Sequence, residues 1–174
     1  GEYWRKLNRE RAYPTEFVKA LTERGWLSVL IPEAYGGAGL GVSAACAILE
    51  EIHRSGCNGA ACHAQMYTMG TLLRHGSDAQ KEKWLPKIAA GEIRLQAFGV
   101  TEPTSGTDTT RIQTFAKRQG DKYVVNGSKI WISRAEHSDL MVLLCRTALR
   151  DENAKPSDGM SVLLVDMREA KGSG

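Results

Sequence analysis

The chain has 174 residues, of which 42% are hydrophobic and 25% charged, and a formal net charge of +3. This composition predicts a soluble globular protein with one ordinary domain or two small ones, and it excludes a disordered chain. Lys and Arg form no block interleaved with aromatic residues, so no nucleic-acid partner is expected, and the apolar runs are too short to span a bilayer.

The first half of the chain is predicted to be helical. Pro14 suits a first helical turn, and an apolar stripe follows it as far as Gly25. Residues 77–80, Ser-Asp-Ala-Gln, have the capping-box pattern, in which a hydroxyl and an amide satisfy each other's backbone N–H groups. Two further helices are expected between these, with Ser43 and Asn58 as their N-terminal caps. Pro86 is expected to restart a short turn that stops at Gly91.

After Gly91 the apolar period changes to two, which is typical of strands. Asn126-Gly127 lies between two β-branched runs and predicts a type I′ hairpin turn, and Gln119-Gly120-Asp121 marks a second reversal. A polar loop is expected at residues 149–158. Strands are predicted around residues 93–97 and at 112–118, 122–125, 128–133, 140–146 and 160–167.

Helices followed by antiparallel strands indicate an α+β chain with two domains. We expect an N-terminal helical bundle over residues 1–92 and a β-sandwich or barrel-like domain over residues 93–174. The chain begins at Gly1 in charged helical sequence and stops at Gly174 shortly after a strand, so we expect it to be truncated and its β domain to be incomplete. Because no leader sequence precedes the helices, we expect an intracellular compartment, such as the cytoplasm.

The four cysteines do not predict a disulfide framework in a chain of this length. Cys57, Cys62 and His63 lie close together, but no C-x-x-C pair accompanies them. We therefore predict no metal site and expect buried, inert thiols.

A glycine-rich stretch occupies residues 32–40, Pro-Glu-Ala-Tyr-Gly-Gly-Ala-Gly-Leu. No strand precedes it, and its glycine spacing differs from a dinucleotide-binding fingerprint. We interpret it as a loop between helices, with a phosphate cradle as the alternative.

A second loop, residues 100–108, crowds three threonines, a serine and a glycine directly after a strand. Hydroxyls and exposed backbone N–H groups can bind the carbonyl edge or the phosphates of a planar cofactor. Taken alone, such a loop is more often a plain connection.

The third candidate is Trp131-Ile132-Ser133, at the end of a predicted strand. In a strand Trp131 and Ser133 would share a face, so the indole could cover a flat ring while the hydroxyl reaches its polar edge. The alternative is a tryptophan of the core.

Four motifs in this order resemble the acyl-CoA dehydrogenase family. They are P-E-x-Y-G-G-x-G-L, H-G-S-x-x-Q-K-x-x-x-L-P-x-I-A-x-G-E, T-E-P-x-x-G-[ST]-D and N-G-x-K-x-W-I-[ST], found at residues 32–40, 75–92, 101–108 and 126–133. The resemblance covers residues 17–167, and the order of four motifs is far more specific than any one of them.

The resemblance implies an FAD-dependent flavoenzyme of fatty-acid and lipid metabolism. It places Thr101 at the pyrimidine edge of the flavin, Trp131 against the isoalloxazine, and Ser133 near the reactive ring nitrogen. It implies that Thr107 contacts both the cofactor and the CoA thioester arm. The implied cofactor-binding set is Phe98, Val100, Thr101, Gly106, Thr107, Trp131, Ile132 and Ser133.

By the same resemblance, the enzyme oxidises acyl-CoA thioesters to trans-2-enoyl-CoA, with electron-transfer flavoprotein as the electron acceptor. The family's catalytic glutamate belongs to a C-terminal helical domain, so we expect it beyond Gly174 and assign no catalytic residue in this chain. The parent is expected to be a homodimer or homotetramer. The alternatives are an acyl-CoA oxidase or flavin monooxygenase of the same fold, and a non-catalytic fragment that binds flavin or acyl-CoA.

Overall fold

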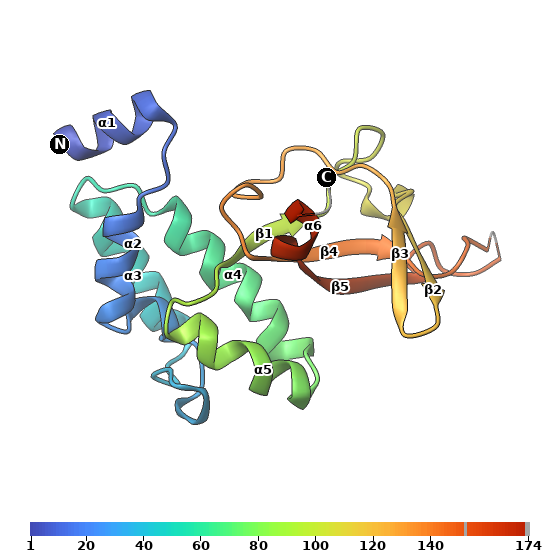
Figure 1. Cartoon of the computed structure of the whole chain (residues 1–174), viewed down its shortest axis with the longest axis horizontal. Coiled ribbons are helices and arrows are strands. Elements are labelled where there is room, and N and C mark those ends of the chain that lie inside the picture. Colours follow the sequence, from blue (N-terminus) through green and yellow to red (C-terminus); the bar gives the residue numbers. More distant parts are fainter. Residues whose placement is uncertain (152, 173–174) are drawn as a thin grey trace. The chain divides into compact units, whose positions relative to one another are not determined.

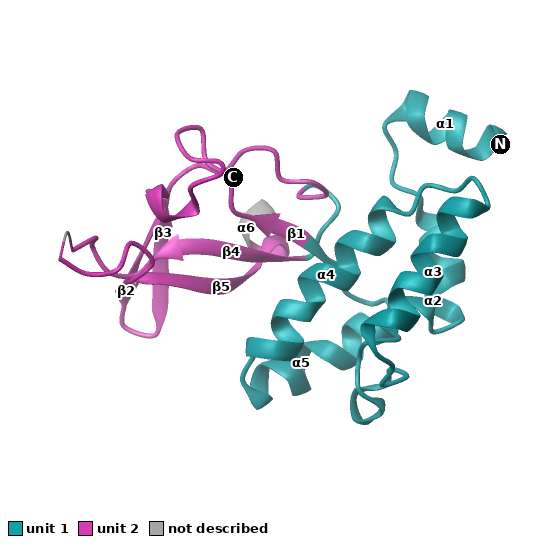
Figure 2. Ribbon diagram, turned by 180° about the vertical axis from the view of Figure 1, so that it is seen from behind, with its two compact units in different colours: residues 1–96, 136–139 teal, residues 97–135, 140–174 magenta. Residues whose placement is uncertain are grey.

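The structure is a computed structural model that describes residues 1–151 and 153–172 (Figure 1). The chain divides into two compact units (Figure 2). Unit 1 comprises residues 1–96 and 136–139, and unit 2 comprises residues 97–135 and 140–174. Because unit 1 includes a segment from the second half of the sequence, the domain division proposed between residues 92 and 93 stays a prediction.

Unit 1 is helical and is built around one long buried helix. Its elements are α1 (Glu2–Glu10), α2 (Thr15–Glu23), α3 (Val42–Arg54), α4 (Ala60–His75) and α5 (Asp78–Ala89), with 3-10 turns at Trp26–Ser28 and Glu33–Tyr35. Helix α4 contributes buried side chains along its length, from Ala61 to Leu72. Apolar residues of α2 and α3, such as Leu21 and Ile52, belong to the same core as Met66 of α4. A helix that is apolar on most of its surface is expected at such a central position.

The start of α5 confirms the predicted capping box. The backbone N–H of Gln80 donates to the Ser77 hydroxyl, while the backbone N–H of Ser77 donates to the Gln80 side chain at 3.0 Å. The prediction that Asn58 is the N-cap of α4 was wrong, because Gly59 occupies that position, although the Asn58 side-chain oxygen accepts from the backbone N–H of Ala60 at 2.9 Å. The prediction for Ser43 was wrong, because α3 already begins at Val42.

Pro86 does not interrupt the chain as expected, because α5 continues through it to Ala89. A proline inside a helix loses one backbone hydrogen bond. The neighbouring Leu85 and Ile88 are both 0% exposed, and the burial of their side chains offsets that loss.

The strands belong to one mixed sheet, with α6 (Met167–Gly172) after the last of them. They are β1 (Leu95–Gly99), β2 (Phe115–Gln119), β3 (Lys122–Asn126), β4 (Leu140–Arg146) and β5 (Met160–Asp166), in the order β1-β4-β2-β3 with β5 also paired to β4. Strands β4 and β5 are antiparallel, from Leu140 opposite Asp166 to Arg146 opposite Met160.

The predicted sheet was wholly antiparallel, but β2 and β4 pair in parallel, with Phe115 opposite Arg146. A parallel pair needs a long connection between its strands. Residues 127–139, which run irregularly between β3 and β4, provide part of it. The core of this unit contains Ala116, Leu143 and Cys145.

The strand predicted at residues 128–133 and its hairpin turn at Asn126-Gly127 were wrong, because no strand follows β3 until Leu140. The reversal lies at Gly120-Asp121, where Gln119 pairs with Lys122, as the second turn signal predicted. Gly127 instead packs against Thr114, so closely that a Cβ there would lie 2.3 Å from the Thr114 hydroxyl oxygen. The glycine therefore serves a close backbone approach and not a turn.

The loop predicted at residues 149–158 lies between β4 and β5. Its residue 152 lies outside the described residues. Of the four free cysteines, Cys62 and Cys145 are buried as expected, but Cys46 is exposed. In the described part of the chain, no helix combines the length and apolarity needed to cross a membrane.

Candidate functional site

Two segments of unit 2 that carry predicted site residues lie side by side. One is residues 100–108, called the 100–108 loop, and the other is residues 127–135, called the 127–135 segment. The backbone N–H of Ile130 donates to the Thr101 carbonyl at 2.9 Å, and the Lys129 ammonium donates to the Val100 carbonyl at 3.0 Å. The fold therefore brings the second and third sequence candidates together.

A buried ion pair joins the same two segments. The Glu102 carboxylate accepts from the Lys129 ammonium at 2.8 Å, and the two side chains are only 4% and 9% exposed. Glu102 also accepts from the backbone N–H groups of Gln113 at 2.6 Å and Thr114 at 2.9 Å. A buried charge is tolerated only with such a set of partners.

Burial alone would raise the pKa of Glu102, but these hydrogen bonds outweigh it and lower the pKa to about 2. Lys129 provides one such bond, and the backbone N–H groups of Gln113 and Thr114 provide two more. A carboxylate with so low a pKa is a weak base, and its oxygens are already engaged. Glu102 is therefore a structural residue and not a catalytic base.

The 100–108 loop is held by hydrogen bonds between its own residues. Glu102 and Ser105 exchange backbone hydrogen bonds of 2.9 and 3.2 Å, and the Ser105 hydroxyl donates to the Asp108 carbonyl at 2.5 Å. Asp108 accepts from both the backbone N–H and the hydroxyl of Thr110. These contacts leave Gly106 and Thr107 exposed.

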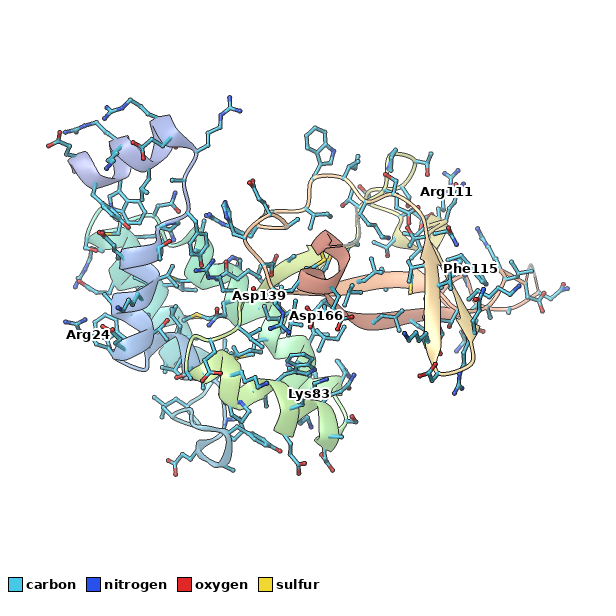
Figure 3. The ribbon with its side chains drawn as sticks, in the orientation of Figure 1. Arg24, Lys83, Arg111, Phe115, Asp139 and Asp166 are labelled. Atoms are coloured by element: carbon cyan, nitrogen blue, oxygen red, sulfur yellow. The ribbon has the colours of Figure 1, made fainter. Side chains whose placement is uncertain are left out.

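Arg146 of β4 holds the chain that follows this loop. Its contacts lie on either side of Arg111, which is labelled in Figure 3. Its buried guanidinium donates to the carbonyls of Thr110 at 2.5 Å and Ile112 at 3.2 Å. It also donates to the carbonyls of Pro156 and Asp158, both at 3.1 Å.

Trp131 is not a core tryptophan, the alternative that the sequence left open, because its side chain is 86% exposed. Its backbone has a φ of 59°, in the left-handed region that a bulky residue seldom adopts. Ser133 lies in a turn and is exposed. The argument that both share one face of a strand was wrong, because this segment is not a strand.

The other predicted residues are partly accessible. Phe98 of β1 is 36% exposed, whereas its strand neighbours Ala97 and Gly99 are buried. Val100, Thr101 and Ile132 are half-buried.

The exposed groups fit a cofactor with a flat ring and polar edges. Within the described part of the chain, the hydroxyls of Thr101, Thr107 and Ser133 have no hydrogen-bond partner, and neither do the backbone N–H groups of Gly106 and Thr107. The indole of Trp131 adds an uncovered aromatic face. FAD offers carbonyl and phosphate oxygens to such donors and a ring system to such a face.

Sequence reasoning missed Lys129, Arg146 and the backbone N–H groups of residues 113–114. Lys129 is part of the fourth motif, N-G-x-K, which was the available signal, but a lysine in a polar stretch is ordinarily solvated. Nothing in the local sequence indicates that Arg146 is buried, because a charged residue at the end of an apolar strand is often at the surface.

The glycine-rich stretch at residues 32–40 is a loop, not a phosphate cradle. The N–H groups of Gly37 and Gly39 donate internally to the carbonyls of Pro32 and Ile31. A Cβ on Gly37 would lie 2.0 Å from the Ile31 carbonyl oxygen, so this glycine is required by packing.

Unit 1 contains a cavity of about 400 Å³ between α3 and α4, lined in part by Met66 and Tyr67. Burial raises the pKa of Tyr67, whose ring meets that of His63 at a tilt of 47°, with ring centroids 5.1 Å apart. Among the described residues, no group of three or more His, Cys, Asp or Glu side chains is placed to hold a metal ion.

Two family descriptions match the chain: "Acyl-CoA dehydrogenase, N-terminal domain" over residues 2–92 and "Acyl-CoA dehydrogenase, middle domain" over residues 97–174. The (2S)-methylsuccinyl-CoA dehydrogenase of Cereibacter sphaeroides is 37% identical over 91% of this chain and 28% of its own. The glutaryl-CoA dehydrogenase of Desulfococcus multivorans is 35% identical over 95% of this chain and 42% of its own.

The crystal structure of an acyl-CoA dehydrogenase from Geobacillus kaustophilus superposes with a TM-score of 0.87 at 31% identity, over 95% of this chain and 43% of that one. The chain thus spans less than half the length of these relatives.

Proposed function

Since the chain belongs to the acyl-CoA dehydrogenase family, we propose that the longer protein that contains it, here called the parent, converts acyl-CoA thioesters to trans-2-enoyl-CoA with FAD. The observation that carries this proposal is the pairing of the 100–108 loop with the 127–135 segment. The pairing exposes an indole face, hydroxyls and backbone N–H groups together on unit 2.

We assign the cofactor contacts to residues on these segments and on the end of β1. The Thr101 hydroxyl would bind the pyrimidine edge of the flavin, the Trp131 indole would cover the isoalloxazine, and the Ser133 hydroxyl would hydrogen-bond near the reactive ring nitrogen. Phe98, Val100 and Ile132 would supply apolar contact, and Gly106 with Thr107 would bind the cofactor and the thioester arm. When bound, FAD supplies the acceptor for the β-hydrogen of the substrate.

The chemistry also requires a base that removes the α-proton of the thioester. The buried Glu102 does not serve, because hydrogen bonds from Lys129 and two backbone N–H groups lower its pKa to about 2, which makes it a weak base whose oxygens are already engaged. We expect this base, a glutamate by family resemblance, in the part of the parent that residues 1–174 do not include.

We propose electron-transfer flavoprotein as the electron acceptor and a dimeric or tetrameric parent. The acyl group stays unassigned, because the relatives' names already differ between methylsuccinyl and glutaryl thioesters.

The test is made on the purified parent. We expect a yellow protein with a flavin absorbance band that bleaches on addition of an acyl-CoA in the absence of oxygen and yields a 2-enoyl-CoA. Reoxidation by electron-transfer flavoprotein, with little hydrogen peroxide in air, separates a dehydrogenase from an oxidase. A parent without flavin, even after FAD is added, contradicts the proposal.

A further inference from the structure

We infer that the Glu102–Lys129 ion pair positions the flavin-contacting residues, although neither side chain is assigned a contact with the flavin. This inference rests on the proposed function, because it concerns the same site. Glu102 follows Thr101 in the 100–108 loop, and Lys129 lies two residues before Trp131 in the 127–135 segment. The pair therefore ties together the two segments that would hold one cofactor.

The first step is that the 127–135 segment has no strand ladder to hold it. Residues 127–139 lie between β3 and β4 without regular structure. In the described part of the chain, three hydrogen bonds are recorded between this segment and the 100–108 loop. They are Ile130 N–H to the Thr101 carbonyl, and Lys129 to the Val100 carbonyl and to Glu102. Lys129 makes two of these three.

The second step is that the backbone of this segment is strained at the functional position. Trp131 and Arg134 have φ values of 59° and 65°. A non-glycine residue in the left-handed region persists only where its surroundings over-determine it. The anchor two residues before Trp131 is therefore needed to keep the indole at a fixed angle.

The third step is that Glu102 is itself held by the backbone of residues 113–114. Its other contacts are the backbone N–H groups of Gln113 and Thr114, and Arg146 donates to the neighbouring Ile112 carbonyl. Gly127 packs against Thr114 as well. Lys129 is thus attached to a rigid support and not to a mobile loop.

The test compares FAD dissociation constants of apo-parent variants by flavin fluorescence. Breaking a buried ion pair by removing one partner leaves an unpaired charge, so Lys129→Met and Glu102→Gln should each weaken FAD binding about tenfold or more. Lys129→Arg, which keeps the charge, should stay within about threefold of wild type. The double variant should bind FAD about as weakly as Lys129→Met alone, because both changes remove the same interaction. Lys122→Met, at an exposed lysine of β3, is the matched control and should bind normally.

A purely structural ion pair predicts a different result: Lys129→Met would lower the melting temperature and leave FAD affinity and the visible circular dichroism of the flavin unchanged. That result overturns the inference. If Lys129→Met does not fold, the double variant provides the test. Wild-type FAD affinity in the double variant also overturns the inference. A wild-type parent that binds no FAD overturns the proposed function and the inference together, whereas normal binding by both wild type and Lys129→Met overturns the inference alone.

Discussion

At the scale of single residues, Trp131 departs most clearly from the burial expected of a large aromatic side chain. Large aromatic side chains ordinarily bury most of their surface, yet its indole is 86% exposed and its φ is 59°. Exposure and backbone strain at one residue together favour a binding role.

We therefore expect Trp131→Ala to weaken FAD binding by the parent about five- to tenfold, since an aromatic contact contributes about 1 kcal/mol beyond the area it buries. Thermal stability of the apo-protein should hardly change, because the indole has little packing to lose. Fluorescence titration measures the affinity, and calorimetry measures the stability. An unchanged affinity together with a lowered melting temperature would return Trp131 to a structural role.

Glu102 gives a prediction for pH. Its pKa is lowered from an ordinary 4.5 to about 2 in the folded chain, so the folded state binds its proton less readily than the unfolded state does. The stabilisation is complete above pH 4.5 and is lost as the pH falls toward 2. Between these limits the free energy of unfolding should fall by roughly 2–3 kcal/mol more in wild type than in Glu102→Gln.

Chemical denaturation of the parent at a series of pH values measures that difference. The comparison with Glu102→Gln cancels the titration of the other carboxylates. Parallel pH profiles for the two proteins would mean that Glu102 titrates normally.

At the scale of elements, helix α5 shows how local chemistry fixes a boundary. Ser77 and Gln80 satisfy two backbone N–H groups that a helix start would otherwise leave unpaired. Ser77→Ala should therefore lower the free energy of unfolding by about 1 kcal/mol. Denaturation with urea measures the loss, and Ser157→Ala in the exposed loop before β5 is the matched control. Equal stability of the two variants would show that the cap adds nothing.

Strand β3 shows the opposite case. All five of its residues are exposed, including Tyr123, Val124 and Val125, and in the described part of the chain it pairs with β2. Residues with strong β propensity on an open edge are a template for association. The element forms from local pattern and a tight turn, and in the order of the described strands it lies at the edge of the sheet.

At the scale of the whole molecule, residues 1–174 produced alone should not turn over acyl-CoA. The reason is our proposal that the catalytic base lies outside these residues, since the loss of a positioned base costs about 10²–10⁴-fold in rate. Glu102 cannot replace it, because its carboxylate is engaged by Lys129 and the backbone. Dye reduction with an acyl-CoA and excess FAD is the assay, and light scattering should reveal association through the open edge of β3. A monodisperse fragment with the turnover of the parent would disprove this and require a base within the chain.

The sequence by itself determined what short-range chemistry controls. The capping box at Ser77, the reversal at Gly120 and the bounds of β4 follow from neighbouring residues and the alternation of apolar side chains. The order of four motifs was enough to identify the family, because that order does not depend on any one local preference.

Only the tertiary structure decided how the site is held. The pattern around residues 128–133 predicted a strand, but Lys129 and Ile130 find their partners in the 100–108 loop instead of in a neighbouring strand. Glu102 and Lys129 are 27 positions apart, and their pairing depends on where the fold brings two buried charges together. Period and propensity report local backbone preference and average burial, whereas a buried ion pair forms only where distant partners satisfy both of its members.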